Sequence, residues 1–278
     1  MSRELSGMLK GLEHLPIEEA YFQAWGRVGG AGRLRRTFSL YADIRRMIEF
    51  QIQKKYPELE DREVQRRTAQ RMYLSDDAAQ RLLEDSKGAL VQGQGIPETM
   101  QRIATILEDL GLRYHFTGGL AATYYGDPRL TQDVDLVIQL EVGQPVTKAL
   151  LNRLSSGYLI HEQAAMEAIQ SQSIFQAIDE ESMVKIDFHV GEKIPGELGR
   201  SARCEIVPGV TAPLVSKEDA ILSKLLWIRL GSGHKSRHDV KVMLKRPEDL
   251  DRAVLERRAA TLGLVDLLVE IEGDSGPD

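Results

Sequence analysis

The first third of the chain carries apolar residues at helical spacing and shows no convincing strand alternation. The clearest apolar stripe consists of Tyr41, Ile44, Ile48, Ile52 and Tyr56. Pro57 is expected to end this helix. Asp61 is a suitable N-cap for a second helix, and residues 78–83 predict a short third one. Residues 91–95 contain two glycines and are expected to form a linker.

Beyond this linker, the pattern alternates between helices and strands. A helix is predicted from Pro97 to Gly111, followed by a short strand over residues 113–117. The next predicted elements are a helix over 120–125, a strand over 133–140, helices over 147–154 and 161–170, and a hairpin of 173–178 with 183–190. Residues 205–207 suggest one more strand, residues 217–272 are expected to be helical, and residues 273–278 to form a frayed tail.

This order predicts the α+β class: a mixed β-sheet with flanking helices, and helical regions at both ends. We divide the chain into a helical N-terminal region (residues 1–95), a core (96–215) and a helical C-terminal region (216–278). The N-terminal region has two interpretations. It is either a module that docks a partner or a scaffold that packs on the core.

Composition narrows the class of protein. Hydrophobic residues make up 42% and charged residues 28% of the chain, as in globular proteins with a real core. No apolar run approaches the ~18 residues needed to span a membrane, and residues 1–6 lack the apolar core of a signal peptide, so we expect a cytoplasmic protein without a membrane partner. A single cysteine, Cys204, excludes an intramolecular disulfide and a cysteine-based zinc site.

The net charge of −6 argues against a general affinity of the whole molecule for nucleic acid. Two groups of basic residues still allow a local basic face. One lies within residues 234–246, and the other consists of Arg33, Arg35, Arg36, Arg45 and Arg46. A solvated helix face explains each group more simply, and the first supports an RNA acceptor only weakly.

Two carboxylates stand at the start of the strand predicted over residues 133–140. Side chains alternate across a strand, so Asp133 and Asp135 project from the same face. Their mutual repulsion and the apolar neighbours Val134 and Leu136 make burial without a partner costly. A divalent cation is the natural partner, and Mg²⁺ held by carboxylates and substrate phosphates fits best.

A glycine turn precedes the acid pair. Gly118 and Gly119 follow a predicted strand, and 13 residues lie between Gly119 and Asp133. Without a Cβ, a glycine lets backbone N–H groups approach a phosphate, and the helix that follows offers its positive N-terminus. Alone, a Gly-Gly pair is more often only a tight turn. Its spacing to the acid pair is what makes Gly118 and Gly119 candidates for phosphate binding.

The glycine turn, the acid pair and the loop Pro128–Asp133 together resemble the signature of the polymerase-β-type nucleotidyltransferase superfamily. The loop is most similar to a bacterial branch near the abortive-infection (type IV toxin–antitoxin) nucleotidyltransferase toxins. The resemblance covers residues 96–270. It implies that the chain is an enzyme and that residues 96–215 form a nucleotidyltransferase-like sheet with flanking helices.

In this superfamily a third acid comes from a later strand beside the first, and Asp187 matches that place. It stands between apolar neighbours, where an unpaired acid has no structural reason to be. The alternative is an edge-strand aspartate that faces solvent. His189 shares a face with Asp187, and a hydrogen bond at the site is a simpler role for it than ligand or base. Trp227 is expected to pack within its helix.

Other residues are candidates for contact with the nucleotide. Arg129 and Thr131 precede the acids and could touch the phosphates, although a salt bridge to a local acid explains Arg129 equally well. The resemblance implies that Lys224 faces the nucleotide, against the alternative of an ordinary exposed lysine. Arg237 and Asp239 match an Arg-x-Asp element of the relatives.

The resemblance implies transfer of a nucleoside monophosphate from an NTP to an acceptor hydroxyl. Asp133, Asp135 and Asp187 would be catalytic and hold two Mg²⁺ ions, or Mn²⁺ in their place, while Gly118, Gly119, Arg129, Thr131 and Lys224 would bind the nucleotide. An RNA 3′ end or a protein is favoured as acceptor over a small molecule, in a toxin or phage-defence setting with a cognate antitoxin as partner. The alternative is a catalytically retired fold that serves as a nucleotide-binding regulatory protein.

Overall fold

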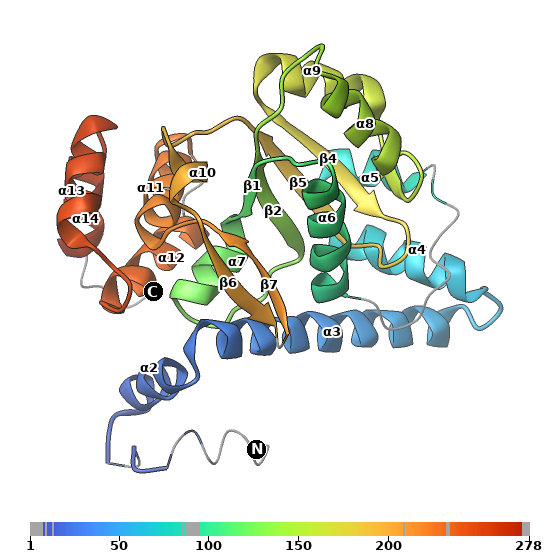
Figure 1. Ribbon diagram of the computed structural model, residues 1–278. Helices are drawn as coiled ribbons and strands as arrows, with labels where there is room; N and C mark the ends of the chain where they lie inside the picture. The colour runs from blue at the N-terminus through green and yellow to red at the C-terminus, as the bar shows by residue number, and fades with distance from the viewer. Residues whose placement is uncertain are drawn as a thin grey trace.

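The structure of the protein is a computed structural model, and it describes residues 8, 10–12, 14–84, 86, 95–207, 209–231 and 234–273 (Figure 1). The described helices are α2 (Ile17–Arg27), α3 (Gly29–Lys55), α4 (Asp61–Met72), α5 (Asp77–Glu84), α6 (Ile96–Asp109), α7 (Gly118–Tyr125), α8 (Pro145–Leu154), α9 (Glu162–Ser171), α10 (Glu197–Arg200), α11 (Lys217–Arg229), α12 (His234–Lys245), α13 (Arg252–Thr261) and α14 (Val265–Gly273). The predicted linker (except Gly95) and the predicted tail (except Gly273) lie outside the described residues.

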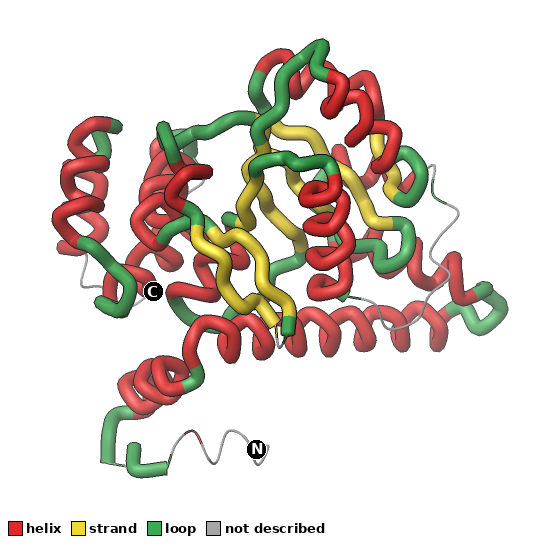
Figure 2. Tube along the Cα trace, viewed as in Figure 1, coloured by secondary structure: helices red, strands yellow, loops and turns green. Residues whose placement is uncertain are grey.

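The strands are β1 (Tyr114–Phe116), β2 (Asp133–Ile138), β3 (Tyr158–Ile160), β4 (Ile174–Asp179), β5 (Lys185–Val190), β6 (Ala202–Val207) and β7 (Val210–Leu214). They form one sheet in the order β3-β4-β5-β2-β1-β7-β6. β2 runs parallel to β5 and β1 parallel to β7, whereas the other neighbours are antiparallel. Helices surround this sheet (Figure 2), so the predicted α+β class with a mixed sheet is confirmed.

Some local predictions differ from the structure. β3 and β7 were not predicted: β3 has three residues, and the pattern of β7 is interrupted by Pro213. Asp61 is not an N-cap, because α4 begins at Asp61 itself and Glu60 precedes it without a side-chain capping bond. In the first turn, the Asp61 carboxylate can still interact favourably with the helix N-terminus.

One apolar core joins the three predicted regions of the chain. It includes Leu34 and Tyr41 from the N-terminal region, Phe188 from the sheet, and Leu222 and Leu255 from the C-terminal helices. Helix α3 lies along one side of the molecule, where it packs on α4, α7 and β6 (Figure 1). The division into three domains stays a prediction.

Helix α3 is 27 residues long, and its arginines explain part of its polarity. Arg33 and Arg45 are 8% and 9% exposed, and their guanidinium groups donate to the carbonyl oxygens of Tyr124 and Ser182. These two arginines therefore connect α3 to the core. The sequence had suggested a solvated helix face for them, and that interpretation is wrong for Arg33 and Arg45. None of the described helices is both long and apolar enough to cross a membrane.

Candidate active site

The sheet brings three carboxylates together at its centre. β2 and β5 are parallel neighbours, and their register places Asp135 opposite Asp187 and Asp133 opposite Lys185. Residues paired in this way project from the same face of a sheet. The side chains of Asp133, Asp135 and Asp187 are 31%, 19% and 15% exposed. β5 lies between β4 and β2, so Asp187 is not the edge-strand residue of the alternative interpretation.

A lysine, Lys185, neutralises part of this acidic group. Its Nζ lies 2.8 Å from Asp187 Oδ2 and 3.5 Å from Asp133 Oδ2, and its side chain is 6% exposed. The same Nζ lies 2.8 Å from Oδ2 of Asp76, which precedes α5. Neither Lys185 nor Asp76 was predicted from the sequence as a member of the site. The alternation that placed His189 beside Asp187 also places Lys185 there, but Asp76 is too distant in sequence for any local pattern to reveal.

Asp135 is held as a carboxylate by different partners. His189 Nε2 lies 3.3 Å from Asp135 Oδ1, and the Gly119 N–H donates to Asp135 Oδ2 at 3.2 Å. Burial raises the pKa of Asp135, but the hydrogen bond to His189 and the charges of His189 and Lys224 outweigh it and hold that pKa well below the ordinary value. Asp135 is therefore ionised at any pH near neutrality.

Asp187 has the opposite environment. Burial raises the pKa of Asp187, and the charges of Asp135 and Asp133 raise it further. Lys185 lowers it, but the net result is a pKa of about 7 instead of 3.8. Its Oδ1 atom is buried and accepts no hydrogen bond within the described part of the chain. A buried carboxylate oxygen without a partner is costly, which marks this atom as a site for a ligand or a proton.

The glycine turn fits closely against the acids. Gly118 has φ of +62°, and a Cβ on it would lie 1.9 Å from Asp135 Oδ2. A Cβ on Gly119 would lie 2.4 Å from Oγ1 of Thr131, and that hydroxyl donates to Asp133 Oδ1 at 3.2 Å. Glycine is required here for packing against the acids. The Gly119 N–H is directed to Asp135 rather than to open space.

The two basic candidates meet at a buried acid. Arg129 donates to both oxygens of Asp239, with Nε at 2.6 Å and Nη2 at 2.7 Å, and Lys224 Nζ lies 3.0 Å from Asp239 Oδ2. Burial raises the pKa of Asp239, but its bonds to Arg129 and Lys224 lower it overall. Arg129 thus forms a salt bridge, but its partner is 110 residues away and is not the local acid that was expected. Lys224, 15% exposed, is not an ordinary surface lysine.

A cleft of about 280 Å³ opens beside the acids. Asp135, Asp187, Gly118 and Lys224 line it, together with Trp227, whose ring lies edge-on to His189 with centroids 6.0 Å apart. The expectation that Trp227 only packs within its helix is therefore wrong. An indole at the wall of a cleft offers an apolar face to a ligand.

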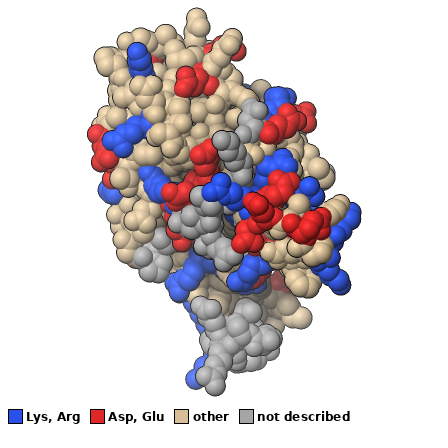
Figure 3. Space-filling model, turned by 90° about the vertical axis from the view of Figure 1, so that its right-hand side faces the viewer, with Lys and Arg blue, Asp and Glu red and all other residues tan. Residues whose placement is uncertain are grey.

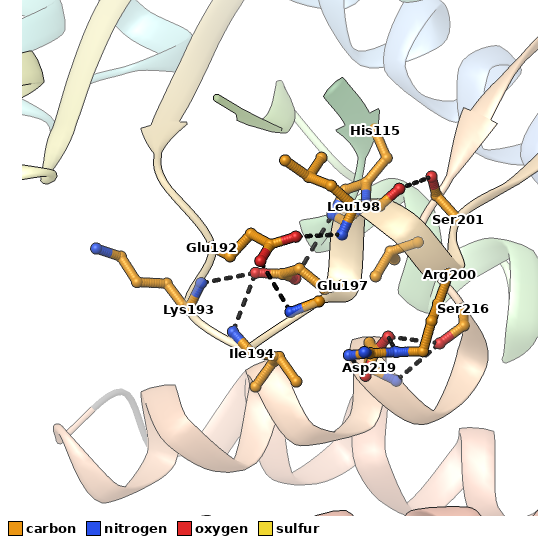
Figure 4. Close-up of polar contacts among 12 residues, drawn as sticks. His115, Glu192, Lys193, Ile194, Glu197, Leu198, Arg200, Ser201, Ser216 and Asp219 are labelled. Carbon is orange, nitrogen blue, oxygen red and sulfur yellow. Dashed lines mark hydrogen bonds and ion pairs between the residues drawn. The ribbon is translucent and has the colours of Figure 1, made fainter. Parts of the chain in front are cut away.

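The turn after β5 forms another wall of this cleft, and its polar contacts hold it in place (Figure 4). Glu197 Oε1 accepts hydrogen bonds from the backbone N–H groups of Lys193 at 2.7 Å and Ile194 at 3.1 Å. Its Oε2 lies 3.6 Å from His115 Nε2, and both side chains are buried. Glu192 accepts from the N–H groups of Gly196 and Leu198. These bonds hold the backbone of the turn, while the exposed Lys193 side chain lies at the cleft and its Nζ donates to the Gln172 carbonyl oxygen.

The basic stretch 234–246 is not a continuous surface patch. Arg246 is 3% exposed and donates to Gly126 O and to Asp127, and Asp239 is equally enclosed. Arg237 pairs with Glu270 at 2.8 Å. Arg237, Asp239 and Arg246 therefore connect this stretch to its neighbours, whereas Lys235, His238 and Lys245 are exposed, so the basic surface is smaller than the sequence suggests.

The acid group can be tested for its fit to a metal ion. Its carboxylate oxygens are the hard donors that Mg²⁺ prefers, and Asp187 Oδ1 lacks any other partner. Across the residues that the structure describes, no three His, Cys, Asp or Glu side chains are already gathered as ligands. Lys185 instead contacts two of the three acids. The donors therefore fit Mg²⁺, with Lys185 as a competing cation.

Comparisons with known proteins find similarity in solved structures only. No protein-family model and no curated protein matches the chain. An antigenic nucleotidyltransferase-like protein from Paracoccidioides brasiliensis is similar over 63% of this chain and 91% of its own, with 21% identity and a TM-score of 0.41. JHP933 from Helicobacter pylori is similar over 63% of this chain and 75% of its own, with 15% identity and a TM-score of 0.36. We therefore derive function from the side chains of the site.

Proposed function

We propose that this protein is a metal-dependent nucleotidyltransferase, which moves a nucleoside monophosphate from an NTP to an acceptor hydroxyl. The observation that carries the proposal is the register of β2 with β5, which sets Asp187 directly opposite Asp135 beside a cleft. Three carboxylates on adjacent interior strands repel one another and do not stabilise a fold. The position of Asp135 and Asp187 at a cleft is explained by chemistry on a phosphorylated substrate.

Asp133, Asp135 and Asp187 would hold Mg²⁺, which when bound neutralises phosphate charge and makes an acceptor hydroxyl more acidic. The acceptor oxygen forms a bond to the α-phosphorus, the bond from that phosphorus to the β-phosphate oxygen breaks, and pyrophosphate leaves. Asp187 Oδ1, which has no hydrogen-bond partner among the described residues, is the atom placed to take the acceptor proton.

The nucleotide side of the cleft is defined by Lys224 and Gly118. Lys224 Nζ supplies a positive charge on the cleft wall, and Asp239 holds that charge in a fixed position together with Arg129. Phosphate oxygens are bound well by such pre-arranged cations. Gly118 lines the same wall, where the lack of a Cβ lets its backbone pack against Asp135, and the N-terminus of α7 adds its partial positive charge.

The acceptor is proposed from the resemblance, which favours an RNA 3′ end or a protein hydroxyl and a toxin or phage-defence setting with an antitoxin partner. A single large basic field for RNA is not found on the face drawn in Figure 3, where basic and acidic side chains are interspersed. A short acceptor segment that enters the cleft needs no such field. Trp227 and Lys193 would then contact the acceptor end.

The test is transfer of label from each α-³²P-labelled NTP, in the presence of Mg²⁺, to total tRNA and cell extract. The wild-type chain is compared with Asp135→Ala and with Glu141→Gln, which removes an exposed acid away from the cleft. Label on RNA, protein or a small molecule that persists in Glu141→Gln and is lost in Asp135→Ala supports the proposal and identifies the acceptor class. Labelling that Asp135→Ala retains would refute it.

One observation favours a second function. The ammonium group of Lys185 already contacts two of the three acids, as in a site that operates without metal. A catalytically retired fold would then bind nucleotides and regulate a partner. Tight nucleotide binding that is independent of Mg²⁺, with no labelled product from any NTP, would favour this function over transfer.

A further inference from the structure

Lys185 connects the acid group to a carboxylate that is not part of the sheet. Its Nζ lies equally close, at 2.8 Å, to Asp187 Oδ2 and to Asp76 Oδ2. Asp76 stands between α4 and α5, 109 residues away in sequence. Lys185 is therefore a single cation shared between two of the proposed metal ligands, Asp133 and Asp187, and one acid outside them.

The N-terminal region contacts both the backbone and the side-chain ammonium group of Lys185. The Tyr73 hydroxyl, at the end of α4, accepts a hydrogen bond from the Lys185 backbone N–H at 3.0 Å. Asp76 is itself fixed, because its Oδ1 accepts from the Ala79 N–H at 3.0 Å and its Oδ2 from Gln176 Nε2 at 3.1 Å. The charged partner outside the metal site is therefore rigid and needs no rearrangement to receive the ammonium group.

A buried ammonium group must keep a counter-ion, because an unpaired buried charge is costly. Without Asp76, Lys185 would have only Asp133 and Asp187 as charged partners within 4 Å among the described residues. Any divalent cation that takes those carboxylates would then leave Lys185 unpaired. With Asp76 in place, the lysine keeps a charged hydrogen bond at 2.8 Å while the other two acids turn to the metal ion.

We infer that Asp76 is a positioning residue for metal binding: Lys185 stands in for the metal ion beside Asp133 and Asp187, and Asp76 keeps Lys185 paired when a metal ion takes those two acids. This inference rests on the proposed metal site. We call Asp76 and Lys185 a counter-ion switch. Without a metal ion, the Lys185 ammonium group balances the charge of Asp133 and Asp187; when a metal ion binds, the ammonium group pairs with Asp76 alone. The N-terminal helical region thereby sets the affinity of the site for divalent cations.

The switch predicts effects of opposite sign. Asp76→Asn leaves Lys185 with only the metal ligands, so binding of Mn²⁺ should weaken about fivefold or more. Lys185→Met removes the competing cation, so binding of Mn²⁺ should tighten about tenfold. In the double variant, Asp76→Asn should have little further effect, because the lysine through which it acts is absent. A purely structural role would lower the stability of both variants without moving the two affinities in opposite directions.

The experiment is calorimetric titration of the full-length chain with MnCl₂ alone, for wild type, Asp76→Asn, Lys185→Met, the double variant and Asp77→Asn. Asp77 is exposed, is adjacent in sequence and carries the same charge, but it forms no ion pair with Lys185, so it controls for long-range electrostatics. The melting temperature of each variant is measured with and without MnCl₂. Lys185→Met should be less stable than wild type without metal and should recover with it.

The outcomes separate this inference from the proposed function. If wild type binds no Mn²⁺, the metal site itself is refuted. If wild type binds Mn²⁺ but Asp76→Asn matches Asp77→Asn, or its effect is undiminished in the Lys185→Met background, the switch is overturned while the metal site stands. If Lys185→Met does not fold, the comparison of Asp76→Asn with Asp77→Asn still decides the role of Asp76.

Discussion

Asp135 of β2 and Asp187 of β5 are register partners on neighbouring parallel strands, yet their surroundings shift their pKa values in opposite directions. His189, Gly119 and nearby cations keep Asp135 ionised, whereas burial and the neighbouring acids raise the pKa of Asp187 to about 7. The two carboxyl groups therefore have different electrostatic surroundings, although they project from the same face of the sheet.

Gly118 is expected to tolerate no side chain. In Gly118→Ala, the Cβ would lie 1.9 Å from Asp135 Oδ2 on a backbone with φ of +62°, so the carboxylate must move. Gly143→Ala is the matched control, because Gly143 also has positive φ, +85°, but nothing within 4 Å of its Cβ position. The control should lose roughly 1–2 kcal/mol of unfolding free energy from the backbone alone.

Chemical denaturation and an activity assay measure the two effects separately. Gly118→Ala should lose more unfolding free energy than Gly143→Ala and should also lose nucleotide transfer. Equal losses of stability, with full activity in Gly118→Ala, would show that close packing against Asp135 is unimportant.

Asp239 is expected to matter both for stability and for nucleotide affinity. Asp239→Asn removes the charge that both Arg129 and Lys224 contact, and breaking such a buried pair costs about 3 kcal/mol or more. The two cations would then repel each other, and the KM for NTP should rise. Glu270→Gln breaks the exposed pair with Arg237 and should cost about 0.5 kcal/mol or less.

Unfolding free energies and nucleotide KM values of both variants check this prediction. An unchanged KM in a folded Asp239→Asn protein would contradict the assignment of Lys224 and Arg129 to the phosphates.

Lys217 predicts a rise in stability at alkaline pH. Burial, which outweighs the acids nearby, lowers its pKa from 10.5 to about 8, while its Nζ donates to the carbonyls of Arg246 and Glu248. Between pH 8 and 10.5, Lys217 is protonated in the unfolded chain and largely neutral in the folded one. The unfolded chain therefore binds more protons, and the free energy of unfolding rises with pH. The upper limit of this contribution is about 3 kcal/mol.

The difference in unfolding free energy between wild type and Lys217→Met isolates this contribution. It should shift in favour of wild type between pH 7.5 and 10, and a difference that is independent of pH would show that the pKa of Lys217 is not lowered.

Removal of residues 1–95 distinguishes the two interpretations of the N-terminal region. Leu34, Tyr41 and Leu83 of that region belong to the same apolar core as the sheet, and Tyr73 contacts the backbone of β5. The shortened chain is therefore expected to be insoluble, as for a scaffold. A soluble chain that retains transfer activity and loses only a binding partner would support the docking interpretation instead.

The sequence was informative where a local pattern carries the information. The alternation of Asp133 and Asp135, and the single acid between apolar residues at Asp187, identified side chains that the sheet brings together. β3 and β7 escaped prediction because β3 has three residues and Pro213 interrupts the pattern of β7. Asp76 could not be found in this way, because its contact with Lys185 depends on the packing of the N-terminal helices against the sheet.

Trp227 shows a different limit. An aromatic residue at helical spacing usually packs inside, and only the tertiary arrangement shows that this indole faces a cleft beside His189. The roles assigned to the acids, the glycines and the basic residues remain predictions, and each is tested by substitution.

The central claim is that the α-phosphoryl group and its nucleoside move to the acceptor. The most direct measurement compares α-³²P-labelled with γ-³²P-labelled NTP on the acceptor found in the screen, for wild type, Asp135→Asn and Asp187→Asn, with folding of each checked by circular dichroism. We predict that wild type transfers the α-label and releases one pyrophosphate per transfer, and that both variants are folded and inactive. Transfer of the γ-label, or full activity in either folded variant, would contradict the account.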